Sequence, residues 1–484
     1  MSLNSLPVET LHQILGYFCI HCSEKRSQVP PDEYLNGNDQ ESDQPSWYSL
    51  QRHALFSICL VSRRLSSIAQ HILYHEFVLG YGNSWRSDYY TWDGRLTSFM
   101  ITIARRRDLA ELVKRVYIHP YLLESFGDET EVPQRYGRSQ LQRDYITDKE
   151  AGRAIRALAA AIEIEKPRRW RATDLVSLLL AALPGLERCS IQLGPYHDAI
   201  VRSAPLRAAG VRELPLRTLD ISLRSDATTS DMFGLEWRAG ALLTVTPHLE
   251  TLNLHMCHEI WGQADPPPLP NLENIRITFS RLQERSLREL LSSCASLRTF
   301  YYETARHPYN VLAPHDHFKL QHVVECLRRH RATLQSVHLD LRQRGRWMEK
   351  TTTPISSFCD FPALKYLLIN MEEFRMSPVA DSEILAQFLP PSIETVHLPS
   401  RIDHSASRQE TVLLGLADAI SRGEFPKLRE IRCDAGETLS NAETIASKFA
   451  VVDVDFGYAI WWPSQATLRG EPDLAAFDYH ELTN

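Results

Sequence analysis

Apolar residues near the start of the chain recur at the spacing of one helical face. Four of them follow the steps i, i+3, i+4 and i+7, which places their side chains on one side of a helix. They are Leu11, Ile14, Leu15 and Phe18. Pro7 suits the first turn of this helix, because its φ is fixed and it has no N–H to lose. A second apolar helix is predicted over 55–69. Helices this short cannot bury all of their apolar surface against one another, so we expect them to need a partner.

A different pattern recurs from residue 184 onward: apolar, two residues, apolar, one residue, apolar. A step of three followed by a step of two indicates a tight turn that leads into a short strand, because strand side chains alternate with period two. Nine segments show it clearly and a tenth more weakly. In chain order they are Leu186/Cys189/Ile191, Leu216/Leu219/Ile221, Leu249/Leu252/Leu254, Leu272/Ile275/Ile277, Leu297/Phe300/Tyr302, Leu334/Val337/Leu339, Leu364/Leu367/Ile369, Ile393/Val396/Leu398, Leu428/Ile431/Cys433 and Phe449/Val452/Val454.

A helical segment precedes most of these predicted strands. The segments lie at 174–183, 286–294, 322–329, 384–389 and 411–422. One strand plus one helix per repeat, stacked side by side, is typical of a leucine-rich-repeat solenoid. The Asn or Cys that such repeats carry after the strand is matched only by Cys257. We therefore expect an irregular solenoid whose turns are held in other ways. The rival architecture is an α/β domain with a parallel sheet, which the absence of a glycine-rich phosphate loop disfavours.

The two N-terminal helical segments resemble an F-box. The first reads Leu6-Pro7-x-Glu9-x-Leu11-x-x-Ile14-Leu15, and the second reads Leu60-Val61-Ser62-Arg63-Arg64-Leu65-x-x-Ile68-Ala69. More narrowly, the chain is similar to F-box proteins of filamentous fungi, in which a leucine-rich-repeat region often follows. It departs from that family in two ways. Leu65 stands where an aromatic residue, often Trp, is usual, and 23–47 reads as an insertion between the two helical parts.

The resemblance implies a role as the substrate-recognition adaptor subunit of an SCF-type cullin–RING ubiquitin ligase. In that role the helical unit docks on the Skp adaptor and through it on a cullin, and the repeats bind a target protein. The docking residues that the resemblance implies are Leu6, Pro7, Leu11, Ile14, Leu15, Leu60, Val61, Leu65 and Ile68. The chain would then be a non-catalytic subunit. The alternative is a repeat scaffold with no ligase role, whose N-terminal helices only cap the end of the repeats.

These patterns together predict an α/β protein of three parts. The F-box would occupy 1–79 with its polar insertion at 23–47, the leucine-rich-repeat-like solenoid 80–460, and a short tail 461–484. A second insertion, at about 119–170, would interrupt the solenoid with a polar loop and an alanine-rich helix over 148–164.

Composition narrows the classes of partner. A net charge of −7 argues against a general nucleic-acid binder held by phosphate contacts. No continuous apolar core of a signal peptide is found near the N-terminus, and the longest mostly apolar run, 175–183, is too short to span a bilayer. We therefore expect a cytoplasmic or nuclear protein with no membrane partner, whose nine cysteines are reduced thiols.

Candidate chemistry is sparse. Cys19-Ile20-His21-Cys22 is a Cys-x-x-Cys sequence that could begin a zinc site, but the chain shows no second ligand pair at a suitable spacing, so a core role is favoured. The histidines of 255–259 and 315–317 are interpreted as loop residues. No nucleophile elbow, zinc-protease motif, phosphate loop or dinucleotide fingerprint occurs. We therefore predict no catalytic centre, no metal and no cofactor.

Overall fold

The structure is a computed structural model. It describes residues 5–24, 47–78, 95–118, 149–164, 172–193, 206, 210–223, 232–236, 242–261, 266–304, 320–341, 357–370, 374, 377–399, 406–434 and 439–459. Most of the two predicted insertions, the predicted tail and the histidines of 315–317 lie outside these residues. The described part divides into two compact units: the first runs to Leu223 and includes Glu236–Leu249, and the second holds 232–235 and everything from Glu250 onward.

The first unit begins with four helices: α1 (Val8–Gly16), α2 (Ile20–Glu24), α3 (Trp47–Cys59) and α4 (Arg63–Leu73). The prediction of one continuous helix over 55–69 is wrong, because the chain breaks between α3 and α4. Ser62 causes the break: its side chain accepts a hydrogen bond from the Leu65 N–H at 3.2 Å and so caps the start of α4. Serine is among the preferred residues at this position, because its oxygen pairs an N–H that has no partner within the helix.

The remainder of the first unit alternates short strands with helices. In chain order these are β1 (Glu76–Val78), α5 (Arg95–Arg105), α6 (Arg107–Ala110), β2 (Arg115–Ile118), α9 (Lys149–Ala161), α10 (Ala172–Ala181), β3 (Arg188–Leu193), β4 (Thr218–Leu223) and the 3₁₀ helix η4 (Leu242–Val245). The alanine-rich helix predicted inside the second insertion is confirmed as α9, which packs against α5.

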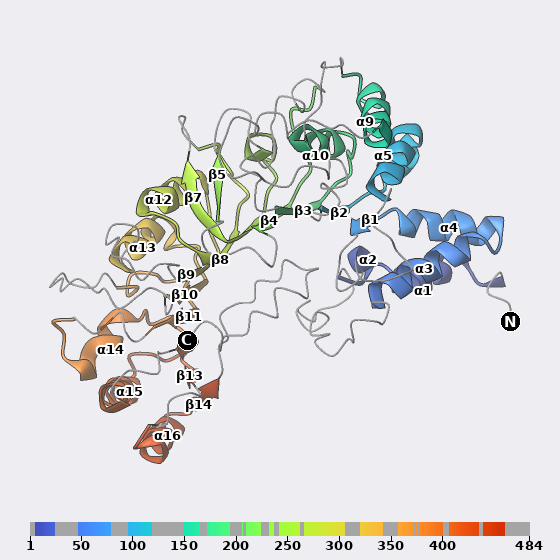
Figure 1. Cartoon of the computed structure of the whole chain (residues 1–484). Coiled ribbons are helices and arrows are strands. Elements are labelled where there is room, and N and C mark those ends of the chain that lie inside the picture. Colours follow the sequence, from blue (N-terminus) through green and yellow to red (C-terminus); the bar gives the residue numbers. More distant parts are fainter. Residues whose placement is uncertain are drawn as a thin grey trace, which may run out of the picture. The chain divides into compact units, whose positions relative to one another are not determined.

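The second unit continues the alternation, with its helices α12 to α16 along one side of the strands (Figure 1). Its strands are β5 (Phe233–Glu236), β6 (Thr251–His255), β7 (Cys257–Trp261), β8 (Asn274–Ser280), β9 (Thr299–Thr304), β10 (Ser336–Asp340), β11 (Tyr366–Ile369), β12 (Thr395–Leu398), β13 (Glu430–Asp434) and β14 (Asp455–Ala459). Its helices are α12 (Glu284–Ser293), α13 (Leu320–Leu327), α14 (Ile384–Phe388), α15 (Ala406–Ser421), α16 (Ala442–Val451) and the 3₁₀ helices η5 (Arg328–His330) and η7 (Asp381–Glu383).

Twelve strands form one parallel sheet in the order β1-β2-β3-β4-β6-β8-β9-β10-β11-β12-β13-β14. The prediction of an α/β fold is therefore confirmed. The order follows the chain without a reversal, whereas a doubly wound α/β domain reverses its strand order at a switch point. The two strands left out, β5 and β7, pair with each other in a small separate sheet that the sequence pattern did not indicate.

The predicted strand segments supply the apolar core. In the first nine segments every apolar residue is buried, and none is more than 5% exposed. Their register matches from strand to strand: Ile275 pairs with Leu252 on one side and Phe300 on the other. Burial of such a side chain contributes about 1.5–3 kcal/mol, so the stacked rows hold the sheet together. The tenth segment is wrongly placed, because Phe449 belongs to α16 and the strand begins at Asp455.

The turns after the strands are held by different side chains, as the missing Asn or Cys positions predict. The Cys257 N–H donates to Ser280 Oγ at 3.0 Å. Further along, Asn370 accepts from the Leu341 N–H at 2.5 Å and donates from its side-chain amide to the Pro399 carbonyl at 3.5 Å. Because each turn relies on its own polar residue, the repeats differ from one another.

Acid is expected to destabilise the second unit through His255. Burial, and next the charge of Arg276, lower the pKa of this imidazole to about 3. In the unfolded chain the pKa is about 6.5. Between these values the unfolded state binds more protons than the folded state, so stability falls as the pH falls below about 6.5. The expected contribution is a loss of up to about 1.4 kcal/mol per pH unit in the free energy of unfolding.

Urea unfolding of the full chain at two pH values, above and below the ordinary histidine pKa, measures this effect. His255→Asn should reduce the pH dependence, because it removes the group that gains a proton on unfolding. His258→Asn, at an exposed position three residues away, should leave it unchanged. Equal pH dependence in the wild type and in His255→Asn would contradict the prediction.

Candidate functional site

The helices α1, α3 and α4 share a small apolar core. It consists of Leu11, Leu15, Cys19, Leu55, Leu65, Ile68, Ala69 and Ile72. Four of the predicted docking residues are therefore core residues: Leu11, Leu15, Leu65 and Ile68 are at most 5% exposed. Leu6 is half-buried and packs against the same core. These five side chains hold the helices together, and only the other four of the nine are exposed.

The exposed members of the predicted set are Pro7, Ile14, Leu60 and Val61. Leu60 and Val61 lie at the break between α3 and α4, and their exposed fractions are 73% and 66%. Sequence reasoning did not single out four further exposed apolar residues of the same helices: Val8, Tyr17, Leu50 and Phe56. A signal for them exists in the sequence: each is an apolar residue in a helix that carries more apolar residues than one buried face can hold.

Exposed large apolar side chains are concentrated in this helical unit. Among the described residues nine such side chains are exposed, and seven of them lie between Val8 and Val61. The other two, Val451 and Tyr458, lie near the end of the second unit. Within the described residues the expectation that the short helices leave apolar surface uncovered is therefore confirmed. Exposed apolar residues gathered in one segment make it the candidate site for a partner.

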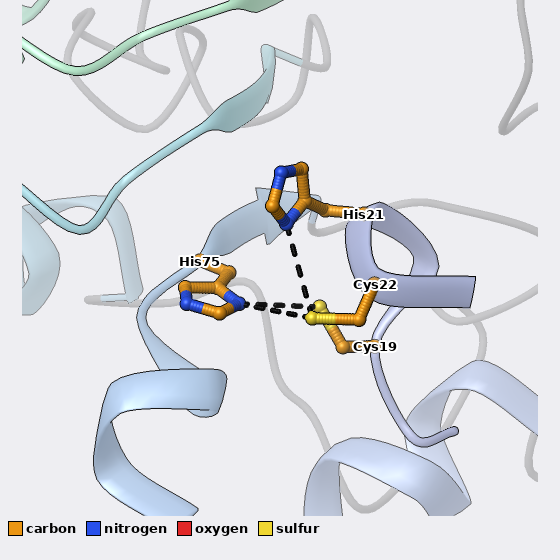
Figure 2. Close-up of side chains that lie close together, drawn as sticks. All are labelled: Cys19, His21, Cys22 and His75. Carbon is orange, nitrogen blue, oxygen red and sulfur yellow. Dashed lines mark hydrogen bonds between the residues drawn. The ribbon is translucent and has the colours of Figure 1, made fainter. Parts of the chain in front are cut away.

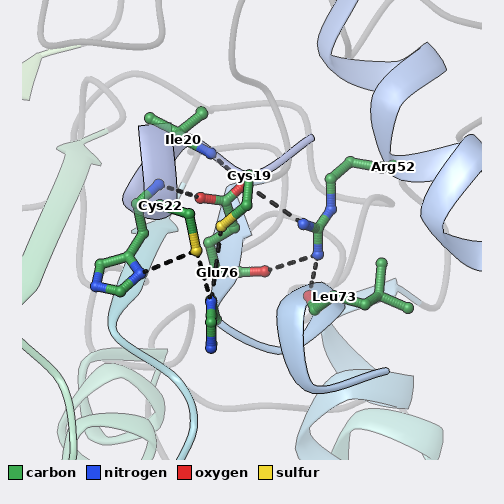
Figure 3. A network of polar contacts seen from close by, with 8 residues as sticks. Cys19, Ile20, Cys22, Arg52, Leu73 and Glu76 are labelled. Atoms are coloured by element: carbon green, nitrogen blue, oxygen red, sulfur yellow. Dashed lines mark hydrogen bonds and ion pairs between the residues drawn. The ribbon is translucent and has the colours of Figure 1, made fainter. Parts of the chain in front are cut away.

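A buried carboxylate connects the helices to the first strand. Glu76, at the start of β1, accepts hydrogen bonds from the backbone N–H groups of Ile20 and His21 at 3.3 and 3.1 Å (Figure 3). Arg52 of α3 pairs with the same carboxylate at 3.4 Å and also bonds the backbone carbonyls of Leu73 and Glu76. Each partner satisfies a charge or a polar group that would otherwise be costly to bury.

Two cysteines and two histidines meet beside this carboxylate. The sulfur atoms of Cys19 and Cys22 lie together, and the imidazoles of His21 and His75 face them (Figure 2). One candidate ligand atom from each residue lies within 4.8 Å of the others. The neighbouring Cys22 thiol, burial and the Glu76 charge, in that order, raise the pKa of Cys19 to about 12. The sequence pattern missed this cluster, because His75 is 53 residues from Cys22 and no local spacing links them.

In the second unit a row of polar and aromatic side chains crosses six neighbouring strands, from β8 to β13. In β8, β9, β10, β12 and β13 buried apolar residues alternate with row residues that are mostly half-buried, whereas Glu303 and Asp340 of the row are themselves buried. The row, which we call the strand-face row, consists of Arg276, Tyr301, Glu303, His338, Asp340, Tyr366, His397, Glu430 and Arg432. Tyr301 stacks on His338 with ring centroids 3.7 Å apart, and the guanidinium of Arg276 lies 4.7 Å from the Tyr301 centroid.

Further along the strand-face row, His397 lies between a phenol and a carboxylate. The Tyr366 hydroxyl is 2.9 Å from its Nδ1, and a Glu430 carboxylate oxygen is 3.7 Å from its Nε2. Burial lowers the pKa of His397 despite the opposing effect of Glu430. The carboxylates of Glu303 and Asp340 with His338 form a second group of possible metal ligands, but Tyr301 already donates a hydrogen bond to Glu303. This face therefore offers fixed aromatic, basic and acidic groups.

The other histidine cluster singled out in the sequence does not form a ligand site. His255 is buried and bonds Thr278 Oγ1 at 3.1 Å, and the Cys257 sulfur donates to the Glu259 carbonyl at 3.4 Å. His258 points outward and is 46% exposed on its side chain. The prediction that these histidines are loop residues is wrong, because His255 ends β6 and His258 lies in β7; structural roles in and between these strands account for 255–259.

No protein-family model matches the chain, and no curated protein matches its sequence. Within the described residues, no helix combines the length and the apolar character needed to cross a membrane.

Glu76→Gln is expected to destabilise the first unit by about 3 kcal/mol or more, because it leaves Arg52 buried opposite a neutral amide. Urea unfolding of the full chain measures the change. Glu187→Gln is the matched control: its pair with Lys114 spans 3.1 Å, against 3.4 Å for Glu76 and Arg52, but both side chains are about one-third exposed, so less than about 1 kcal/mol should be lost. Equal effects of the two changes would show that the Glu76 pair has no special structural role.

Proposed function

We propose that this chain is the substrate-recognition adaptor subunit of an SCF-type cullin–RING ubiquitin ligase. Its N-terminal helices would dock on the Skp adaptor, and its leucine-rich-repeat-like solenoid would bind a target protein. The single observation that supports docking is the concentration of exposed apolar side chains between Val8 and Val61. The resemblance of the same segment to an F-box supplies the identity of the partner.

The docking surface in this proposal consists of the exposed residues alone. Leu60 and Val61 are its centre, because they are adjacent in the chain and more exposed than any other apolar residues of the helical unit except Tyr17. Ile14 and Tyr17 add a second pair, three residues apart and hence neighbours on a helix surface. Apolar side chains that fill pockets on a partner dominate the binding free energy of such interfaces.

The mechanism that follows is tethering. The chain would hold a target protein near the ligase subunit and the E2 that carry out the chemistry. A bound target then meets the activated ubiquitin at a raised effective concentration, so the transfer becomes an intramolecular encounter. No acid, base or nucleophile of this chain is needed for that role.

The strand-face row is the proposed site for the target. Its side chains stand on strands whose register is fixed by backbone pairing, so little conformational freedom is lost on binding. Aromatic and charged groups in one row suit a polar peptide segment that offers charges of both signs. Toward β13 the row becomes more accessible, since the Glu430 side chain is 38% exposed and that of Arg432 is 22% exposed.

The second candidate is a repeat scaffold whose N-terminal helices are only an end cap. It is favoured by the fact that Leu11, Leu15, Leu65 and Ile68 already form a closed core. On that account the exposed apolar residues have no Skp partner, and the purified chain never recruits the adaptor.

The double change Leu60→Asp with Val61→Asp tests docking. It should weaken binding to the Skp adaptor by about 2 kcal/mol or more, which is about 30-fold, because it places charges in an apolar interface. Co-purification and titration calorimetry with the recombinant adaptor measure the loss. A change at Leu15 would be uninformative, because this core residue is 2% exposed and an aspartate there would disrupt the helices.

Val451→Asp is the matched control. Val451 is 86% exposed on α16 of the second unit, so the change removes an apolar surface residue outside the proposed interface. Its adaptor affinity should equal that of the wild type. If the Leu60 and Val61 variant binds the adaptor as tightly as the control, the proposed function is wrong.

The combined change Glu430→Ala with Arg432→Ala tests the target site. It should remove or deplete several-fold the target proteins that the chain captures in a stalled ligase, while adaptor binding stays unchanged. Quantitative mass spectrometry of the captured proteins is the readout. Arg422→Ala with Glu424→Ala removes a comparable exposed pair at the end of α15, joined at 2.7 Å, and should have no effect. The same capture by both variants would exclude the strand-face row as the target site.

A further inference from the structure

We propose that Cys19, His21, Cys22 and His75 form a tetrahedral zinc site within the first unit. This site is independent of the adaptor role, because its ligands are buried or half-buried and none of them is one of the exposed residues proposed for docking. The set of two thiols and two imidazoles is one of the ligand combinations of structural zinc sites. It arises from three residues of one short segment and a fourth that the fold brings in from the end of α4.

The spacing of the ligand atoms fits a zinc ion. Zinc–sulfur and zinc–nitrogen bonds of about 2.3 and 2.0 Å at a tetrahedral angle place sulfur and nitrogen about 3.6 Å apart. His75 Nδ1 lies 3.2 Å from Cys22 Sγ and 3.8 Å from Cys19 Sγ, and His21 Nδ1 lies 3.9 Å from Cys22 Sγ. Shifts of a few tenths of an ångström would bring all three distances to the expected value.

The imidazoles have no competing oxygen partners. Among the described residues, the hydrogen-bond partners of both Nδ1 atoms are cysteine sulfurs, which are weak donors and acceptors. The other nitrogen of His21 is buried without a hydrogen-bond partner in the same part of the chain. A buried imidazole nitrogen without a partner is costly, whereas a metal would use one lone pair from each of the four side chains.

The surrounding network holds the ligands in place. The Glu76 carboxylate follows His75 in the chain and binds the backbone N–H groups of Ile20 and His21 (Figure 3). Glu76 therefore holds the segment with Cys19, His21 and Cys22 close to His75, its own neighbour in the chain. Interactions of this kind around the ligands orient metal sites and are part of their affinity.

The ligand chemistry selects zinc. Two thiolates and two neutral imidazoles in tetrahedral arrangement suit Zn²⁺, and hard cations such as Mg²⁺ and Ca²⁺ prefer oxygen ligands. Two thiolates also neutralise the charge of the ion, which lowers the cost of burying it. The zinc would join the start of α2 to the end of α4, across 53 residues of chain. Small units with a limited apolar core often depend on such a cross-link.

Metal analysis of the full chain, purified under reducing conditions, tests the site directly. We expect about one zinc ion per chain. Replacement by Co²⁺ should give the visible absorption of tetrahedral cobalt with a thiolate-to-cobalt charge-transfer band. Removal of zinc by a chelator should lower the thermal midpoint of the helical unit, and added zinc should restore it. A chain without zinc that gives no thiolate band with Co²⁺, or one with Cys19 and Cys22 joined in a disulfide, would overturn the proposal.

Substitutions identify the ligands. Cys22→Ser and His75→Ala should each lose stoichiometric zinc, and Cys59→Ser and His71→Ala, in the same helices but outside the cluster, should keep it. His75→Cys should keep zinc, and its cobalt spectrum should show the contribution of a third thiolate. If His75 were not a ligand, this change would leave the cobalt spectrum as in the wild type. Zinc retained by Cys22→Ser and His75→Ala at the wild-type level would place the metal elsewhere and refute the assignment.

Discussion

Most strands of the large sheet are joined to their predecessor at their start by one peptide carbonyl, and the register of the sheet depends on this repeated contact. The carbonyl before one strand accepts the N–H groups of two consecutive residues at the start of the next. Gln335, for example, accepts from Lys365 and Tyr366 at 2.8 and 3.1 Å, and Lys365 in turn accepts from Glu394 and Thr395. The same pattern begins at His75 and recurs up to Glu394, and at the last strand the Arg429 carbonyl accepts one N–H, that of Asp455. It sets the register, and a slip of one residue would turn every apolar side chain to the opposite face.

A fixed register separates the residues that stabilise the fold from those available for recognition. In β10, Val337 and Leu339 are fully buried, while the side chain of His338 between them is 12% exposed and stacks on Tyr301. The residues on this face can therefore differ from strand to strand without a loss of core packing. The backbone hydrogen bonds between strands require only that the first residues of neighbouring strands stay in register. Irregular turns are compatible with this, because each needs only one polar side chain, such as Ser280 or Asn370, to pair its own N–H.

The sequence predicts the periodic parts of this structure well and the isolated contacts poorly. Nine strands follow from the three-plus-two step, because a buried strand must alternate and a tight turn must precede it. Most of the predicted helices lie within a few residues of their observed bounds, as for α12 and α14. The tenth strand was misplaced because the helix α16 supplies apolar residues at the same steps. The Cys and His cluster was missed because a contact between Cys22 and His75 depends on the packing of α2 against β1, which no local pattern encodes.

The break at Ser62 shows how one side chain can decide whether a motif residue is core or surface. If α3 and α4 were one helix, Val61 would lie four residues before Leu65 and seven before Ile68, on the same buried face. Instead the Ser62 hydroxyl caps a new helix, so the chain turns before it and both Leu60 and Val61 point outward. Two consecutive residues of a continuous helix are 100° apart and rarely share one environment. The cap therefore leaves Leu60 and Val61 on the surface, while the apolar core of the helices is closed without them.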